Sequence, residues 1–386
     1  MHIRTRPATG PWLANPISYF GTTRGARVCL AIPLFVISLA LATHKAAAQG
    51  CVAIRNNPNP SSVLIESDLQ GVSLGANEWI GSLGFRWFQS NRVFSGDVEQ
   101  PQLYGQMANQ VYTFDVSATY GITARWSVSL DVPYSYGTRS TFYEHDRVTQ
   151  HTMTARGIGD VRFTTDVWLL DPHEHMDGNI SLGVGFTAPT GDANATDTAY
   201  RATGPVTRPV DVSIQPGTGG WGIILEMQAY QKIYGNLFAY LNGSYIMTPQ
   251  EQNDTEYTLA DIPGVAAFLT PSQTHNSIPD QYLGRGGFSY IVWLEQGLTV
   301  SLGARIDGIP AYDAIGGSNG FRRSGYVVSI EPGLSWTYKQ NSLSITAPVA
   351  VYRNRTQSAP EAELDRAPGF AAFADYSIQA TFTHRF

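Results

Sequence analysis

The stretch YVVSIEPGLSWTY, residues 326–338, alternates along its length between two kinds of side chain. One face carries Tyr326, Val328, Ile330, Leu334, Trp336 and Tyr338, and the other carries Val327, Ser329, Glu331, Gly333, Ser335 and Thr337. A period of two is typical of a β-strand whose faces meet different surroundings. The run is longer than the five or six residues of an ordinary strand, and it suits a tilted strand that crosses a bilayer.

The same alternation recurs along the chain, most clearly at 298–307 and 126–136, and predicts about twelve strands. The predicted strands lie at 77–88, 108–121, 125–137, 158–170, 179–188, 221–232, 236–247, 281–294, 297–307, 322–338, 342–352 and 371–386.

The connections between these segments alternate in length. The long ones are 89–107, 138–157, 189–220, 248–280, 308–321 and 353–370, and the short ones are 122–124, 171–178, 233–235, 295–296 and 339–341. Bacterial outer-membrane barrels have an even number of strands, short periplasmic turns and longer outer loops. The sequence therefore predicts an all-β fold, a transmembrane antiparallel up-and-down β-barrel of about twelve strands. We expect a monomer surrounded by outer-membrane lipid, with a secreted β-sandwich as the alternative fold.

The last strand supports this prediction. Residues 376–386 alternate in the same way and end in Phe386, which resembles the terminal signal that barrel-assembly machinery recognises. Composition agrees: charged residues make up only 15 % of the 386-residue chain, Gly numbers 38, and mean hydropathy is −0.14. Alternating apolar and polar positions produce this combination. The net charge of −6 argues against a nucleic-acid partner.

The N-terminal region has the features of an export signal. Arginines precede the apolar run 28–42, and small residues follow at 46–48. We therefore predict a signal peptide at 1–48, a periplasmic segment or lumen plug at 49–76, and the barrel at 77–386. Whether Cys51 is lipidated stays open at this point, because the residues before it lack the usual leucine.

Two stretches resemble a known family. Gly157-Ile158-Gly159-Asp160 opens one predicted strand, and NISLGVGFTAPTGD follows at 179–192. The second run is similar to the G-x-G-x-x-x-P-T-G-D run of outer-membrane channel proteins labelled transporter or MetA-pathway of phenol degradation. The resemblance covers about thirty-five residues. It implies a channel for uptake or efflux of small apolar or aromatic compounds.

From the residues alone, we interpret these Gly- and Asp-containing motifs as turn formers at the barrel rim. Glycine accepts positive φ, and aspartate caps nearby backbone.

Charged residues fall on the faces opposite the large apolar side chains, so we predict that they line the lumen. A charge facing lipid near the midplane costs about 2–4 kcal/mol. The predicted lumen residues are Arg86, Asp115, Asp131, Arg162, Asp166, Glu226, Lys232, Arg285, Arg305, Asp307 and Glu331. They either pair across a narrow lumen or select solutes in a channel, and the two roles are compatible. The connection 189–220 is long enough to fold over the mouth.

Enzymatic function is not expected. A barrel hydrolase would need a Ser with a base within reach on a membrane strand, whereas His275-Asn276-Ser277 falls in a predicted loop. His173-Glu174-His175 lies in a polar turn and offers too few ligands for a zinc site. We therefore predict no catalytic residues, no metal and no cofactor. The leading hypothesis is a solute channel, and the alternatives are a closed structural or adhesive barrel and, more remotely, an outer-membrane hydrolase.

Overall fold

The computed structural model describes residues 74–267 and 269–386. The predicted signal peptide, Cys51 and nearly all of the predicted segment 49–76 lie outside these residues. Within the described ranges, no helix has both the length and the apolar character needed to cross a membrane.

Twelve antiparallel strands form the barrel in the described part of the chain, two of them in two pieces each. They are β1 (Trp79–Ser95), β3 (Met107–Gly121), β4 (Trp126–Thr141), β5 with β6 (His151–Ile158, Val161–Trp168), β7 (Gly178–Ala188), β10 (Gly222–Tyr234), β11 (Leu237–Met247), β14 (Gln281–Trp293), β15 (Leu298–Ile309), β16 (Gly325–Tyr338), β17 with β18 (Asn341–Thr346, Val349–Asn354) and β19 (Ala371–Arg385).

The first and last strands close the sheet. β1 pairs with β19 from Ile80↔Arg385 to Phe94↔Ala371, so every strand of the barrel has a neighbour on both sides over part of its length. This closure confirms the predicted barrel and excludes the β-sandwich, in which two separate sheets would face each other. Sequential neighbours pair throughout, which is the up-and-down topology expected from the alternating loops.

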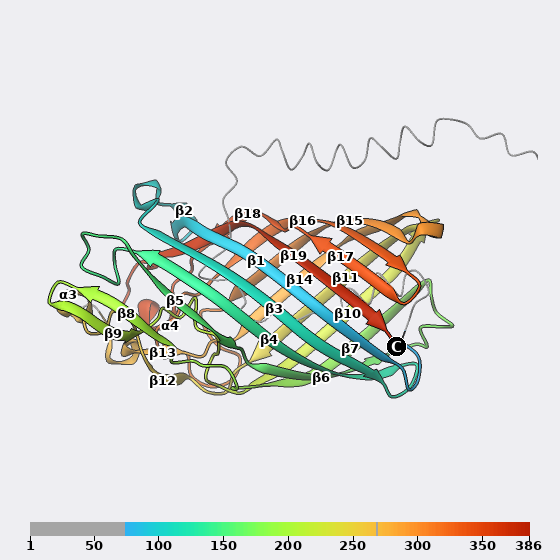
Figure 1. Cartoon of the computed structure of the whole chain (residues 1–386), viewed down its shortest axis with the longest axis horizontal. Helices are drawn as coiled ribbons and strands as arrows, with labels where there is room; N and C mark the ends of the chain where they lie inside the picture. Colours follow the sequence, from blue (N-terminus) through green and yellow to red (C-terminus); the bar gives the residue numbers. More distant parts are fainter. Residues whose placement is uncertain (1–73, 268) are drawn as a thin grey trace, which may run out of the picture. The chain divides into compact units, whose positions relative to one another are not determined.

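The two ends of the barrel differ, as the loop lengths predicted. The short turns, the start of β1 and the end of β19 lie at one end of the barrel, here called the turn end. The long connections lie at the other, here called the loop end (Figure 1). The loop end holds the small elements β2 (Val98–Glu99), η1 (Pro101–Leu103), β8 (Thr196–Arg201), β9 (Gly204–Pro209), β12 (Gln252–Glu256), α3 (Pro263–Ala266), η2 (Pro271–Thr274), β13 (His275–Ser277) and α4 (Ala359–Glu363). The short helix η3 (Leu294–Gln296) connects β14 to β15 at the turn end.

The two faces of the sheet follow the sequence alternation. The outward face exposes large apolar side chains, among them Leu83, Phe114, Val116, Leu130, Leu182, Val184, Leu302 and Leu334. The inward face is buried and polar, with Ser82, Ser117, Ser289, Thr299, Ser329 and Ser335 between the charged residues. This inverted distribution places apolar groups against lipid and polar groups in the interior.

Aromatic pairs mark the borders of the apolar band. The rings of Trp79 and Tyr120 pack in a tilted arrangement at the turn end, with centroids 4.7 Å apart, and the ring centroids of Tyr112 and Tyr136 are 6.1 Å apart nearer the loop end. Trp87, opposite Tyr112 in the register, is eight residues beyond Trp79. At about 3.3 Å per residue and a tilt of about 40°, these rows lie about 20 Å apart, close to the height of an outer-membrane apolar band.

Three strands extend well beyond their predicted limits at the loop end. β1 continues to Ser95 instead of 88, β4 continues to Thr141 instead of 137, and β5 begins at His151 instead of 158. These extensions lie beyond the outer aromatic row, where no lipid face imposes alternation. The prediction therefore ended the strands at the border of the apolar band.

Candidate functional site: the lumen and its mouth

Ten of the eleven predicted lumen residues occupy inward positions in the strands, opposite the exposed apolar face. We call them the charged layer: Arg86, Asp115, Asp131, Arg162, Asp166, Glu226, Arg285, Arg305, Asp307 and Glu331. The eleventh, Lys232, shares the inward register but lies near the turn end. Its Nζ is 2.8 Å from Asp177 Oδ1, and its side chain is 39 % exposed. Lys232 therefore belongs to the rim.

A chain of ion pairs joins the residues contributed by β14, β15 and β16. Arg285 Nη1 lies 3.0 Å from Glu331 Oε1, and Arg305 Nη1 lies 3.4 Å from Glu331 Oε2. Arg305 Nε also donates to Asp307 Oδ1 at 2.9 Å. These buried charges are therefore paired, the condition under which ionised groups are tolerated away from water.

The opposite wall is rich in carboxylates. Arg162 Nη2 lies 2.8 Å from Glu226 Oε1, although β7 runs between their strands. The inward position on β7 is Gly183, where a Cβ would collide with the Asp166 carboxylate and come within 3.3 Å of Glu226 Cβ. Because Gly183 has no side chain, Arg162 of β6 and Glu226 of β10 can make contact across the inward face of β7. Asp131 faces the same region.

The charged layer contains six carboxylates and four guanidinium groups, a formal charge of −2. The excess lies on the wall around Arg162, whereas the wall around Arg305 is more evenly paired. An acidic lumen lowers the free energy of cations relative to anions.

A loop segment enters the barrel from the loop end. Residues 210–218, here called the mouth segment, belong to the connection between β7 and β10. Val210 and Ile214 are 1 % and 3 % exposed and pack in one apolar cluster with the inward-facing Phe88 and Val111. The predicted folding of this connection over the mouth is confirmed, and burial of these side chains holds it there.

Three glycines let the mouth segment approach the wall. A Cβ on Gly191 would lie 2.7 Å from Gly217 Cα and 2.9 Å from Gly159 Cα, closer than real side chains come. The Asp160 carboxylate holds these segments together. Its Oδ2 accepts hydrogen bonds from the Thr218 amide at 2.8 Å and from the Thr218 hydroxyl at 2.6 Å. Its Oδ1 accepts from the Gly191 amide at 3.1 Å.

This arrangement corrects one sequence interpretation. The motif glycines Gly159 and Gly191 were expected to serve turns through positive φ, but neither has a positive φ. Their requirement is close approach between backbones. The expectation that aspartate caps nearby backbone holds for Asp192, whose Oδ1 accepts from the Asn194 amide at 2.8 Å. Asp160 instead binds distant segments.

An ion-pair cluster fixes the start of the mouth segment. Both carboxylate oxygens of Asp211 accept from Arg323, at 2.8 and 2.6 Å, and Arg139 Nη2 lies 3.9 Å away. Arg139 Nε donates to Glu144 Oε1 at 2.6 Å. We call Asp211, Arg323, Arg139 and Glu144 the latch. It ties together the connections 142–150, 189–221 and 310–324, which with 248–280 form the cap.

The latch carboxylates respond differently to burial. Burial alone would raise the pKa of Asp211, but Arg139 and Arg323 together hold it well below its usual range. Burial raises the pKa of Glu144 despite its contact with Arg139. Because the folded pKa of Asp211 is depressed, its stabilising contribution is present above the unfolded value of about 3.9 and is lost only as pH falls towards the folded value.

Aromatic and ionic contacts join the connection 248–280 to the connection 310–324 and hold the latter in shape. The rings of Tyr257 and Phe321 stack with centroids 3.6 Å apart, and the guanidinium of Arg323 lies 4.9 Å from the Phe321 centroid. Arg322 binds Asp313 through both terminal nitrogens, at 2.8 and 2.6 Å. The cap is thus a connected unit built from four loops.

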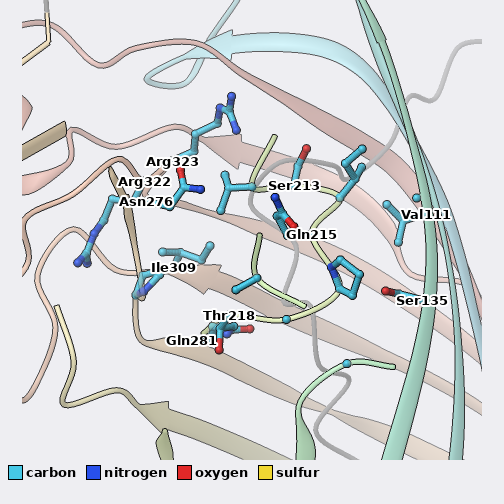
Figure 2. Close-up of a pocket in the computed structure, with 18 of the residues that line it drawn as sticks. Val111, Ser135, Ser213, Gln215, Thr218, Asn276, Gln281, Ile309, Arg322 and Arg323 are labelled. Carbon is cyan, nitrogen blue, oxygen red and sulfur yellow. The ribbon is translucent and has the colours of Figure 1, made fainter. Parts of the chain in front are cut away.

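A pocket lies in the lumen around the mouth segment, beside the outer end of the charged layer (Figure 2). It holds about 60 Å³ of free space, and part of the surrounding hollow opens to solvent. Strand residues such as Val111 and Ser135 form one side, and Asn276, Arg322 and Arg323 lie across the mouth segment from them.

His145 makes the cap sensitive to acid. Its Nδ1 accepts from the Tyr200 amide at 3.1 Å, and burial, with help from His151 and Arg201, lowers its pKa to about 4. The unfolded side chain titrates near 6.5, so protons favour the unfolded cap between these values. We expect cap stability to fall as pH falls from about 6.5 to about 4, as protection factors from hydrogen exchange would measure.

Replacement by a neutral acceptor isolates this effect. His145→Asn should keep an acceptor near Tyr200 and flatten the pH dependence, whereas His173→Asn in the turn-end connection should leave it unchanged. Equal pH dependence in wild type and His145→Asn would exclude His145 as the cause. Asp146 and Asp197 also face this histidine and stay in place in both variants.

Apart from Arg86, the latch and pocket residues were not predicted from the sequence. Asp211, Arg139 and Arg323 lie in loops or strand extensions, where no periodicity fixes the direction of a side chain. One signal was present: Val210, Val212 and Ile214 alternate within the long connection 189–220. Apolar alternation inside a long loop indicates burial against another element.

The histidine motifs lie where the sequence suggested. In the turn between β6 and β7, His173 Nδ1 is 3.3 Å from Asp171 Oδ1, and its side chain is half exposed. Across residues 74–267 and 269–386, no group of three or more His, Cys, Asp or Glu residues could hold a metal ion. His275 to Ser277 form β13 within the cap, and Asn276 lines the pocket.

Comparison with known proteins identifies the fold. No family model matches the chain, and no curated protein matches it. An outer-membrane channel from Pseudomonas putida F1 superposes with a TM-score of 0.53 and 12 % sequence identity, over 81 % of this chain and 97 % of that one. At this identity the likeness establishes the fold, and it agrees at that level with the channel barrel expected from the motifs.

Two further barrels superpose less well. The β domain of the Bordetella autotransporter BrkA gives a TM-score of 0.42 at 12 % identity, over 80 % of this chain and 100 % of that one. The monoaromatic hydrocarbon channel CymD gives 0.40 at 9 % identity, over 89 % and 99 %.

Proposed function

We propose that this barrel is a channel that passes small apolar or aromatic solutes across the outer membrane of a bacterium. The observation that carries the proposal is the pocket in the lumen, partly open to solvent and next to the charged layer. The likeness to an outer-membrane channel and the apolar parts of the pocket wall support the same reading.

The proposal includes export and membrane assembly. The chain is exported by its N-terminal signal, and barrel-assembly machinery inserts it as a monomer through the C-terminal strand. Phe386 ends that strand at the turn end, where its amide donates to Trp79 O at 2.8 Å. No nucleic acid, metal or enzymatic activity is part of the proposed function.

Conductance and solute entry test the proposal. The protein is purified from outer membranes, shown to migrate differently before and after boiling, and inserted in planar bilayers and liposomes. A channel gives discrete current steps, and liposomes that contain it swell in isosmotic small solutes. A heat-modifiable barrel with neither property would overturn the channel and leave the fold intact.

The charged layer should set ion selectivity if ions pass through it. Arg305→Ala removes one guanidinium and makes the layer more acidic, so we expect the reversal potential in a KCl gradient to move towards that of K⁺. Lys232→Ala removes the same charge at the rim and serves as the control, because its side chain is more exposed to screening salt. Equal reversal potentials in wild type and Arg305→Ala would place the ion path away from Arg305.

A closed structural or adhesive barrel is the second candidate. The latch and the paired arginines favour it, because they hold the cap loops together and cross-link part of the interior. Under this reading the outer loops would bind a partner and the bilayer would stay silent.

A further inference from the structure

The outward face of the sheet has a hollow near the turn end, where small side chains gather. Gly178, Ala229 and Ala239 lie in the outward register of β7, β10 and β11, three strands that are neighbours in the sheet. The hollow, here called the outer groove, holds about 530 Å³ of free space. Pockets that take small molecules measure about 300–1,000 Å³, so the outer groove has room for a ligand.

Larger apolar side chains form the walls of the outer groove. In the register of the sheet, Ala229 lies between Ile180 of β7 and Leu241 of β11, which are 42 % and 49 % exposed. Leu169 and Leu170, just after β6, are also exposed and complete the wall on one side. Exposed apolar side chains on the outward face of an outer-membrane barrel meet lipid. The outer groove therefore belongs to the lipid side of the wall and is separate from the lumen.

Hydrocarbon chains are the groups that meet such a hollow in a membrane. Lipid tails are as apolar as leucine, so the hydrophobic effect gives no gain when a tail enters the outer groove. The gain comes from dispersion contacts, which the walls lose wherever the hollow stays empty. Small residues let another chain approach the backbone closely, so the floor of Gly178, Ala229 and Ala239 suits a thin, flexible acyl chain.

Two exposed groups of opposite charge stand beside the groove wall at the turn end. Arg125 donates from Nε to Trp168 O at 2.9 Å and from Nη2 to Leu169 O at 2.7 Å. These bonds use two of the five N–H donors of its exposed guanidinium. The side chain of Asp171 is 34 % exposed and lies close enough for its charge to attract that of Arg125. A cation and an anion thus border the apolar groove.

We propose that the outer groove binds a phospholipid with an ethanolamine headgroup, its acyl chain over Ala229, its phosphate at Arg125 and its ammonium at Asp171. A guanidinium matches phosphate oxygens with N–H donors in a fixed fork. Exposed Trp126 follows Arg125, and Trp and Arg side chains anchor membrane proteins at the level of the headgroups. The inference concerns the lipid contact of the barrel and does not depend on the proposed channel.

Native mass spectrometry of the full-length, heat-modifiable protein tests the site. The probes are phosphatidylethanolamine and phosphatidylglycerol with the same acyl chains. Titration should give saturable binding of one phosphatidylethanolamine, at least fivefold tighter than that of phosphatidylglycerol. Ala229→Leu fills the outer groove and should weaken the binding of both lipids more than fivefold. Ala118→Leu adds the same side chain at an exposed position of β3, outside the groove, and should bind both lipids like wild type.

Two further variants separate the headgroup from the acyl chain. Arg125→Gln removes the phosphate contact and should weaken the binding of both lipids, whereas Asp171→Asn should weaken only phosphatidylethanolamine and abolish the preference. Arg156→Gln removes an exposed arginine at the loop end and should bind both lipids like wild type.

The results distinguish this site from the channel. Equal lipid affinity of wild type and Ala229→Leu overturns the outer groove as a lipid site, and equal affinity of wild type for the two lipids overturns the headgroup assignment. Heat-modifiability, conductance and swelling should be unchanged in Ala229→Leu, because the groove lies outside the lumen. A conducting barrel without saturable lipid binding would therefore lose only the lipid site, and a silent barrel that binds the lipid would lose only the channel.

Discussion

Asp211→Ala is expected to raise the single-channel conductance several-fold while the barrel stays intact. Asp211 is fully buried in the latch, where it binds Arg323 through both oxygens and lies near Arg139. Its removal leaves two buried guanidinium groups without this carboxylate, a change that typically costs about 3–5 kcal/mol. That cost falls on the cap and not on the twelve-strand sheet, so the mouth segment should leave the lumen.

Three measurements check this prediction together. Conductance should rise, hydrogen exchange in residues 210–218 should accelerate, and the heat-modifiable gel shift should persist. Asp254→Ala removes an exposed carboxylate from the same cap and should change none of them. Faster exchange at unchanged conductance would show that the mouth segment does not limit the current.

Arg162→Met is expected to shift selectivity strongly towards cations. Arg162 pairs with Glu226 at 2.8 Å and faces Asp131 and Asp166 on the acidic wall. The substitution changes the formal charge of the charged layer from −2 to −3 at the point where carboxylates already exceed guanidinium groups. Buried like charges raise the local electrostatic potential energy of anions and also destabilise the wall that holds them.

The reversal potential in a KCl gradient and the temperature of the gel shift measure the two effects. We expect the first to approach the K⁺ equilibrium value and the second to fall. The double variant Arg162→Met with Glu226→Leu restores the formal charge of −2 and should recover both in part. Arg156→Met removes an exposed arginine outside the charged layer and serves as the control. An unchanged reversal potential would separate the ion path from this wall.

The strands were predictable because lipid imposes a strict rule on them. Positions such as Leu83 and Leu334 must be apolar and their neighbours may be polar, and this repeats over the whole apolar band. The same rule predicted the inward register of the charged residues. It gave no information beyond the outer aromatic row, which explains the missed ends of β1 and β4 and the missed start of β5.

The cap could not be predicted because its contacts are distant in sequence and follow no period. Asp211 and Arg323 are 112 positions apart, and each lies in a connection whose residues share no repeating face. Partner choice there depends on where the loops meet in space. Lys232 shows a different limit of the sequence pattern. The alternation of side chains placed it correctly on the inward face of β10, but alternation does not tell how far along the strand a residue lies.

The close approach of the backbones at Gly159, Gly191 and Gly217 limits which substitutions can be compensated by a second mutation during evolution. When a large residue packs against a small one, a mutation in the first can be suppressed by an opposite change in the second. Here each partner already has no side chain to give up, so no second-site reduction in size can make room for a Cβ at Gly191. A lineage that lost one of these glycines would have to move the backbone of the whole mouth segment. The three positions are therefore expected to persist together or to disappear together with the segment.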